Sequence, residues 1–296
     1  MKVTLECAHC LLDRAINQIK LATDDPNLQM DVVSAMLEFL SREFDENSVP
    51  SHIGTDRDLL VQEMTGKDPY EELKQMSNKM VLSVLPELRK LVNEVSNEHE
   101  RFRRATLIAA AANAIEFDVS GRDFSLDELR GILERVESDL AIDEVDAFHA
   151  LCREAAEVLY LLDNAGEIVL DMILISEIKR LGPRVVAVVK GGPVLNDATM
   201  IDSKEVGLDE CADTVIDTGA AAIGVNLERN SEEFKTIFHS AELIVAKGMG
   251  NYESLTELKP NCPVVHIFRT KCLPVAQHIG VGRNQNVVLV RYPKES

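Results

Sequence analysis

The sequence predicts an all-α helical domain over residues 1–155, followed by an α/β domain over residues 156–296 with a parallel or mostly parallel sheet. In the first half, apolar residues recur at helical spacings of three and four, as in Leu11, Ala15 and Ile19. In the second half, short β-branched or aliphatic runs alternate with helical segments. That alternation is typical of βαβ units on a parallel sheet.

The predicted strands are the short apolar runs of the second half. They lie at Val158–Leu162, Val185–Val189, Thr214–Ile216, Leu243–Ala246, Val264–Phe268 and Val287–Val290. The domain boundary falls within a predicted helix over residues 143–157, without a flexible linker. We therefore expect a fixed cleft between the two domains.

The charge balance argues against several classes of partner. The chain has 31 Lys and Arg against 50 Asp and Glu, a formal net charge of −19. Such a field repels phosphate backbones and anionic lipid, so we expect no binding to nucleic acid or to a membrane surface. No apolar run approaches the roughly 18 residues of a membrane-spanning helix. Six cysteines in 296 residues indicate reduced thiols rather than a disulfide framework, so a cytoplasmic protein is expected.

Polar side chains and glycines follow five consecutive predicted strands. In an open parallel sheet, ligands bind beyond the carboxyl ends of the strands, because every strand-to-helix loop lies there. We therefore expect a ligand site at this edge of the sheet. The segments concerned are Asp163–Glu167, Lys190–Thr199, Asp217–Gly219, Lys247–Glu253 and Arg269–Lys271.

Two of these segments place an aspartate beside an asparagine, as Asp163-Asn164 and Asn196-Asp197. Mg²⁺ prefers oxygen ligands and usually takes one or two protein carboxylates, with water and substrate phosphate completing its shell. Asp163, Asn164 and Asp197 would supply such a partial shell. The alternative is that the two aspartates only cap the helices that follow them.

A phosphate site is predicted at the end of two further strands. Lys247 leads into Gly248-Met249-Gly250-Asn251, where the glycines allow backbone amides to approach a ligand at a helix start. Lys271 would add a second ammonium group. The alternative is that both lysines merely end strands.

These groups predict hydrolysis of a phosphomonoester by water that a divalent cation activates. Glu167, at the start of the next helix, is the candidate base; its alternative role is a favourable charge at a helix N-terminus. A methyltransferase that uses S-adenosyl-methionine would require a glycine-rich loop after the first strand and an acid after the second, where Lys190 stands. A non-catalytic metal or metabolite sensor is the third possibility.

The motifs together resemble the metal-dependent damage-control phosphatases, a family long classed as a domain of unknown function, and in particular its small prokaryotic branch. The resemblance extends over nearly the whole chain in the order of the family. It is carried by Asp163-Asn164-Ala165-Gly166-Glu167, Asn196-Asp197-Ala198-Thr199, Lys247-Gly248-Met249-Gly250-Asn251-Tyr252, Arg269-Thr270-Lys271-Cys272, Cys7-x-x-Cys10 and Ala112-Asn113-Ala114-Ile115-Glu116-Phe117.

The resemblance implies a helical N-terminal domain beside a Rossmann-like α/β domain, with Mg²⁺, Mn²⁺, Co²⁺ or Ni²⁺ held by Asp163, Asn164 and Asp197. It also implies phosphate contacts from the Lys247–Asn251 segment and Lys271, and a contribution from Asn113. The Arg269–Lys271 motif lacks the spacer residue of eukaryotic relatives. Family substrates include sugar phosphates and phosphopantetheine-type metabolites, and one eukaryotic relative has been described as a carboxyl methyltransferase.

Overall fold

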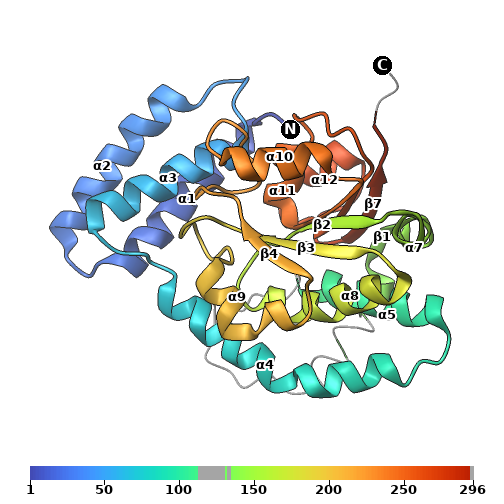
Figure 1. The fold of residues 1–296 in the computed structure, drawn as a ribbon. Helices are drawn as coiled ribbons and strands as arrows, with labels where there is room; N and C mark the ends of the chain where they lie inside the picture. Colours follow the sequence, from blue (N-terminus) through green and yellow to red (C-terminus); the bar gives the residue numbers. More distant parts are fainter. Residues whose placement is uncertain (113–130, 132–134, 294–296) are drawn as a thin grey trace.

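The computed structural model describes residues 1–112, 131 and 135–293, which build a seven-stranded sheet with helices on both faces (Figure 1). The strand order is β1-β7-β6-β5-β2-β3-β4. The strands are β1 (Leu140–Asp143), β2 (Glu157–Leu161), β3 (Arg184–Val189), β4 (Thr214–Asp217), β5 (Leu243–Lys247), β6 (Val264–Arg269) and β7 (Asn286–Arg291).

The predicted mostly parallel sheet is confirmed. All six predicted apolar runs are strands, β2 to β7. Neighbouring strands from β4 to β6 pair in parallel, whereas β7 is antiparallel to β6.

One strand was not predicted, and the description of residues 1–155 as all helical is wrong at this point. β1 pairs with β7 at the edge of the sheet. It is only four residues long, and half-buried residues alternate with exposed ones along it. A run this short carries too little apolar periodicity to be distinguished from a loop.

The helices are distributed along the whole chain. They are α1 (Leu5–Ala22), α2 (Pro26–Glu43), α3 (Pro50–Thr65), α4 (Glu71–Asn93), α5 (Glu98–Ala112), α7 (Val145–Glu154), α8 (Glu167–Leu181), α9 (Met200–Val206), α10 (Glu232–Ser240), α11 (Gly248–Leu255) and α12 (Leu273–Ile279). Both α2 and α3 begin with proline, which suits the first helical turn because its missing N–H would have no partner there.

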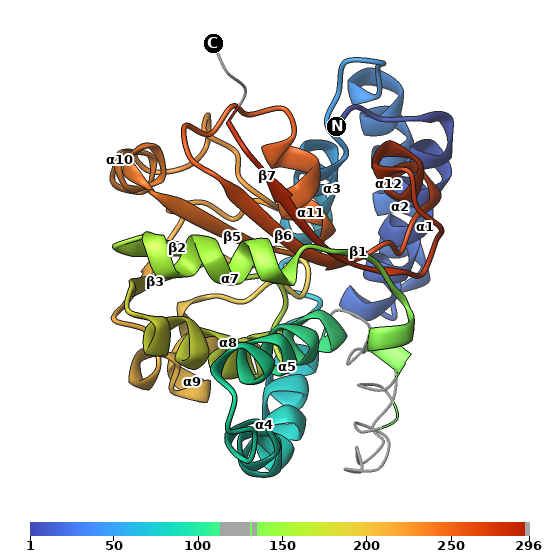
Figure 2. The same ribbon diagram turned by 90° about the vertical axis from the view of Figure 1, so that its right-hand side faces the viewer.

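The sheet is the middle layer of the molecule. Helices α4, α5, α8 and α9 cover one face, and α10 and α11 cover the other (Figure 2). Alternate residues of β2 divide between the two cores: Tyr160 joins the core beneath α8, and Leu161 joins the opposite one. Phe102 of α5 also belongs to the core beneath α8, so this helix packs with the sheet although it lies in the predicted helical half.

Helices α1 to α3 form a separate group with its own small core, which includes Ile19, Met36 and Val61. They lie together at one end of the molecule (Figure 1). Several hydrogen bonds join α3 to loops of the sheet. Among them, Thr55 Oγ1 accepts from the N–H of Ile223 at 2.9 Å, and Gln62 Nε2 donates to the carbonyl of Pro193 at 3.2 Å. These contacts bring α3 over the carboxyl ends of the strands.

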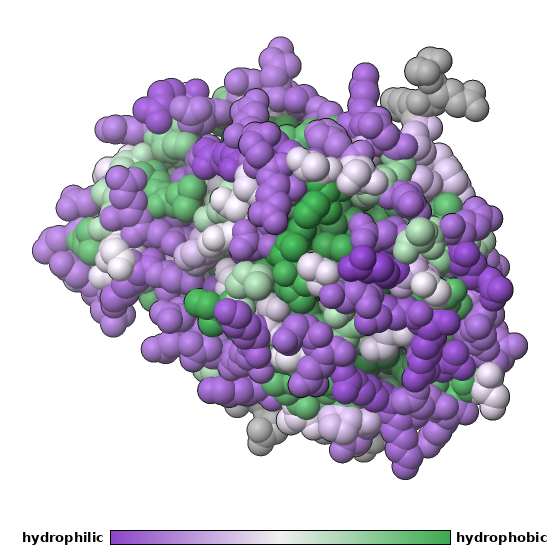
Figure 3. Space-filling model, viewed as in Figure 1, coloured by the Kyte–Doolittle hydropathy of each residue, from purple (hydrophilic) through white to green (hydrophobic). Residues whose placement is uncertain are grey.

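The face shown in Figure 3 is mostly hydrophilic, as the excess of acidic residues requires, with apolar residues gathered near its centre and over the α1–α3 end. Leu21, Met30 and Leu37 are large apolar side chains exposed on α1 and α2. None of the helices in the described part of the chain combines the length and the hydropathy that crossing a bilayer would demand.

Candidate metal and phosphate site

The site lies where the strand order of the parallel part of the sheet reverses. From β2 the chain proceeds through β3 to β4 on one side, and then returns to β5 and β6 on the other. Loops that leave the carboxyl ends of the two central strands separate at such a point and leave a crevice for a ligand. Here they are the segment that begins at Leu162 and the segment that begins at Gly248.

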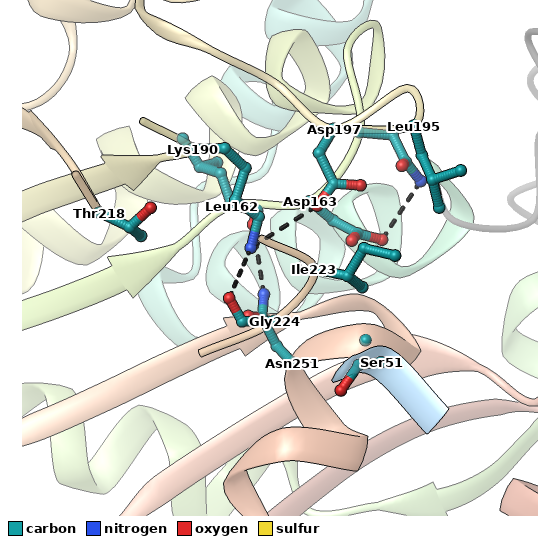
Figure 4. Close-up of polar contacts among 12 residues, drawn as sticks. Ser51, Leu162, Asp163, Lys190, Leu195, Asp197, Thr218, Ile223, Gly224 and Asn251 are labelled. Carbon is teal, nitrogen blue, oxygen red and sulfur yellow. Dashed lines mark hydrogen bonds and ion pairs between the residues drawn. The ribbon is translucent and has the colours of Figure 1, made fainter. Parts of the chain in front are cut away.

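Backbone hydrogen bonds join the loops that follow β2 and β3. The N–H of Ala165 donates to the carbonyl of Asn196 at 2.9 Å, and the N–H of Ala198 donates to the carbonyl of Asp163 at 2.8 Å. Asn164 and Asp197 thereby face each other in a short antiparallel bridge. The structure thus brings the three predicted metal ligands together, and Asp163, Asp197 and Lys190 point toward one another in Figure 4.

The aspartates do not have the capping role that the sequence left open. The N-cap of α8 is Gly166, and the N-cap of α9 is Thr199, which forms a capping box with Asp202. Asp163 and Asp197 therefore lie before the helix starts, and the carboxylates belong to the loops.

Burial and mutual repulsion dominate the electrostatics of the site. Burial, followed by the charges of Glu167 and Asp197, raises the pKa of Asp163 well above its ordinary value. Burial is also the main reason that the pKa of Asp197 is raised to about 6. The positive charges of Lys190 and Lys271 oppose these effects and lower the pKa of Asp163.

The donor set suits a hard divalent cation. Asp163 and Asp197 offer carboxylate oxygens, Asn164 offers a carboxamide, and Asp197 Oδ2 has no hydrogen-bond partner within the described residues. No three His, Cys, Asp or Glu side chains form a metal-ligating group in that part of the chain. A cation held here would therefore take the rest of its shell from water and substrate, which is the usual state of Mg²⁺.

Glu167 lies beside the three metal-ligand candidates, as predicted. It is 1% exposed, and its Oε1 accepts a hydrogen bond from Asn164 Nδ2 at 2.7 Å. The same amide donates to Asp163 Oδ2 at 3.2 Å. Asn164 therefore holds both carboxylates in place.

Lys247 pairs with a buried carboxylate, and the charges of Glu167 and Asp163 also act on it. Its ammonium group is fully buried and forms an ion pair with Asp171 Oδ1 of α8 at 2.7 Å, and the hydroxyl of Tyr160 donates to the same oxygen at 2.8 Å. The side chain points to the α8 face of the sheet. The contact between Lys247 and a substrate phosphate stays a prediction.

The remaining phosphate-site candidates have different surroundings. Gly248 lies against the carboxylate of Asp163. The side chain of Asn251 is buried; its Nδ2 donates to the carbonyl of Leu162 at 3.2 Å, while its Oδ1 has no partner within the described residues. Met249 packs with an apolar cluster that includes Phe268.

Lys271 is half-buried, and its charge acts on Asp163 as described above. Its carbonyl accepts a hydrogen bond from Arg283 Nε at 2.9 Å, which helps to position the loop after β6. Asn113 lies outside the residues that the structure describes.

Two further residues belong to the site. Lys190 Nζ donates to the carbonyl of Gly224 at 3.0 Å and lies 3.6 Å from Asp197 Oδ2. Asp58 of α3 accepts a hydrogen bond from the N–H of Leu195 at 3.2 Å. The pKa of Asp197 is raised mainly by burial and further by the charge of Asp58, whereas Lys190 lowers it. The position of Lys190 at a strand end could have indicated from the sequence that it belongs to the site. Asp58 comes from a different group of helices, and no pattern in the sequence indicated its place in the site.

Comparisons with known proteins identify the family of this chain. The damage-control phosphatase ARMT1-like domain matches residues 3–287. A damage-control phosphatase of Archaeoglobus fulgidus is 34% identical over 98% of this chain and 99% of its own length. An uncharacterized protein of Methanocaldococcus jannaschii is 38% identical over 98% of this chain and 96% of its own.

A solved structure extends the match to the whole fold. The crystal structure of a DUF89 family protein from Pyrococcus horikoshii has a TM-score of 0.89 and 30% sequence identity, and the match covers 100% of both chains. The family match spans the helical region and the sheet as far as the start of β7, including every described segment of the site. This chain belongs to the damage-control phosphatase ARMT1-like family.

Proposed function

We propose that the protein is a divalent-metal-dependent phosphatase that hydrolyses a phosphomonoester of a small metabolite. The observation that carries the proposal is the meeting of Asp163, Asn164 and Asp197 at the point where the strand order reverses. The carboxylates of the half-buried Asp163 and the buried Asp197, with the carboxamide of Asn164, form the partial shell that a hard cation shares with a substrate phosphate. The names of the relatives as damage-control phosphatases support the same reaction.

The metal ion would be Mg²⁺, Mn²⁺, Co²⁺ or Ni²⁺, and when bound it would lower the pKa of an attacking water and offset negative charge on the phosphoryl group. The ammonium groups of Lys190 and Lys271 supply positive charge on the phosphate side. Glu167 would accept the proton of the attacking water, because its carboxylate lies next to Asn164, a proposed ligand. The ester P–O bond would break as the new P–O bond forms, and the alcohol would leave with a proton from solvent.

The family resemblance and one buried polar atom support a proposed substrate class. We propose a sugar phosphate or a phosphopantetheine-type ester. Asn251 Oδ1, beside Lys190 and Gly224 in Figure 4, would accept a hydrogen bond from a hydroxyl or amide group of either kind of substrate. We also propose that the sheet is of the Rossmann-like type, because its parallel strands reverse their order at β2 and β5.

Phosphate release from a panel of phosphomonoesters tests the proposal. The wild-type protein should release phosphate with at least one of the four metals and none with a chelator. Asp197→Ala should abolish release, whereas Asp209→Asn, which changes an exposed acidic residue on the short 3-10 helix after α9, should retain it. Consumption of a methyl donor without phosphate release would instead indicate a methyltransferase, and metal binding without turnover would indicate a sensor.

A further inference from the structure

We propose that Arg57 of α3, with Arg14 of α1 beside it, forms a second anion-binding subsite that recognises a carboxylate or a second phosphate group on the substrate. This inference rests on the proposed phosphatase function and deepens it, because it names a chemical feature of the substrate. The shared chemistry is an oxyanion with two oxygens free to accept hydrogen bonds in one plane.

Arg57 is a buried cation with two hydrogen-bonding nitrogens that have no partner among the described residues. Its side chain is 1% exposed, and neither Nε nor Nη2 has a hydrogen-bond partner in the part of the chain that the structure describes. These two groups lie along one edge of the guanidinium plane. That edge binds a carboxylate or phosphate through two parallel hydrogen bonds. Two adjacent unsatisfied donors of a buried charge are costly unless a ligand occupies them.

A second cation, Arg14, acts on Arg57 at this place, in opposition to the carboxylate of Asp58. Burial, and then the charge of Arg14, lower the pKa of Arg57. Asp58, the next residue of α3, directs its carboxylate elsewhere: it accepts hydrogen bonds from Gln18 and from the N–H of Leu195. In a chain with a net charge of −19, two arginines act on each other here, with Asp58 acting on Arg57 and Glu253 acting on Arg14.

The position of α3 relates this subsite to the metal site. Asp58 is bonded to the loop that carries Asp197, and it follows Arg57 directly. One turn earlier on α3, a Cβ at Gly54 would lie 3.2 Å from the Cδ1 of Ile223. Ile223 in turn lies against Gly250, in the first turn of α11. Arg57 thus belongs to the helix that borders both loops of the site, and an acidic group at the far end of a substrate can bind it.

A matched pair of esters tests the carboxylate form of this inference. 3-Phosphoglycerate and glycerol 3-phosphate differ by a carboxylate in place of a hydroxymethyl group. The readout is the ratio of their kcat/KM values within each variant. This ratio does not change when a variant simply contains less folded enzyme. The wild type should prefer the acidic ester by at least about tenfold, mainly through KM.

Arg57→Met should reduce this ratio to near one, and Arg57→Lys, which keeps the charge but loses the bidentate edge, should give an intermediate value. Fructose 1,6-bisphosphate against fructose 6-phosphate provides the corresponding comparison for a second phosphate. A wild-type ratio near one for both pairs, or a preference that persists in both variants, would overturn the subsite.

Binding to the metal-free protein separates this inference from the phosphatase proposal. With a chelator present, calorimetric titration with malonate or with inorganic phosphate measures oxyanion binding without any turnover. At least one of these anions should bind the wild type. Its binding to the Arg57→Lys variant should be at least about tenfold weaker. If no ester is hydrolysed yet this difference remains, the phosphatase proposal fails and the subsite stands. Absence of binding, or equal binding to both proteins, rejects the subsite.

Discussion

The carboxylate of Asp163 lies in the space where a side chain of residue 248 would begin. A Cβ built on Gly248 would be 1.9 Å from Asp163 Oδ2 and 2.2 Å from its Cγ. The backbone of Gly248 has a φ of +78°, in the left-handed region that favours glycine. The first residue of α11 therefore has to be glycine for the carboxylate at the end of β2 to hold its position.

Gly248→Ala should reduce metal-dependent phosphate release by at least about tenfold, because the methyl group displaces the Asp163 carboxylate, and sub-ångström misplacement of catalytic groups is costly. The positive φ adds a strain of about 1–2 kcal/mol. Gly280→Ala is the matched control: Gly280 has a φ of +77°, and a Cβ there would meet nothing within 4 Å. It should lose a similar amount of thermal stability and keep its activity.

Equal activity in the two alanine variants would show that the contact between Gly248 and Asp163 is irrelevant to turnover. Equal loss of activity would show that backbone strain alone is responsible. Thermal unfolding of both variants, measured beside the phosphate assay, distinguishes these results from simple unfolding.

The direction of the Lys247 side chain could have been predicted from the sequence, but the alternation along β5 was not applied to it. Side chains alternate along a strand, and Val245 of β5 faces the core beneath α8 whereas Ala246 faces the opposite core. By the same alternation Lys247 faces α8, where Asp171 lies. The residue types at the strand ends predicted that a site exists; the direction of each side chain required this further step.

Other parts of the site depend on contacts that no local pattern encodes. Asp58 and Arg57 come from a helix with its own core, and their position depends on how α3 packs over the sheet. Asp163, Asn164 and Asp197 were predictable because parallel strands bring successive loops to one edge. Long-range packing, in contrast, has no periodic signature in the sequence.

Lys247→Met should destabilise the protein rather than weaken substrate binding. It leaves the carboxylate of Asp171 buried and without its counter-ion, which costs about 3–5 kcal/mol. Tyr160→Phe removes only a hydrogen bond to the same carboxylate and should cost about 1 kcal/mol. Chemical denaturation measures both. A Lys247→Met protein with wild-type stability and a raised KM would restore the phosphate-binding role that the sequence suggested.

Metal binding should stabilise the folded protein through Asp163 and Asp197. A ligand that binds only the folded state at a concentration 100 times its Kd adds about 2.7 kcal/mol, so Tm should rise by several degrees with Mn²⁺ or Ni²⁺. Asp163→Asn should lose most of this rise. Because burial and neighbouring carboxylates raise the pKa of Asp163, the neutral amide should not make the metal-free protein less stable. Asp209→Asn should respond to metal as the wild type does, and an undiminished rise in Asp163→Asn would exclude this carboxylate as a ligand.

The buried imidazole of His266 should make stability depend on pH. His266 of β6 is 1% exposed, and burial, followed by the charge of Arg291, lowers its pKa to about 3. In the unfolded chain a histidine has a pKa of about 6.5. Between about pH 3 and pH 6.5 the imidazole is therefore protonated in the unfolded chain and neutral in the folded protein. Stability from this residue is therefore complete above about pH 6.5 and decreases by up to about 1.4 kcal/mol per unit as the pH falls toward 3.

His266→Gln should flatten the pH dependence of the free energy of unfolding between pH 6 and pH 4, relative to His239→Gln, which replaces an exposed histidine of α10. Parallel profiles for the two variants would show that folding does not lower the pKa of His266.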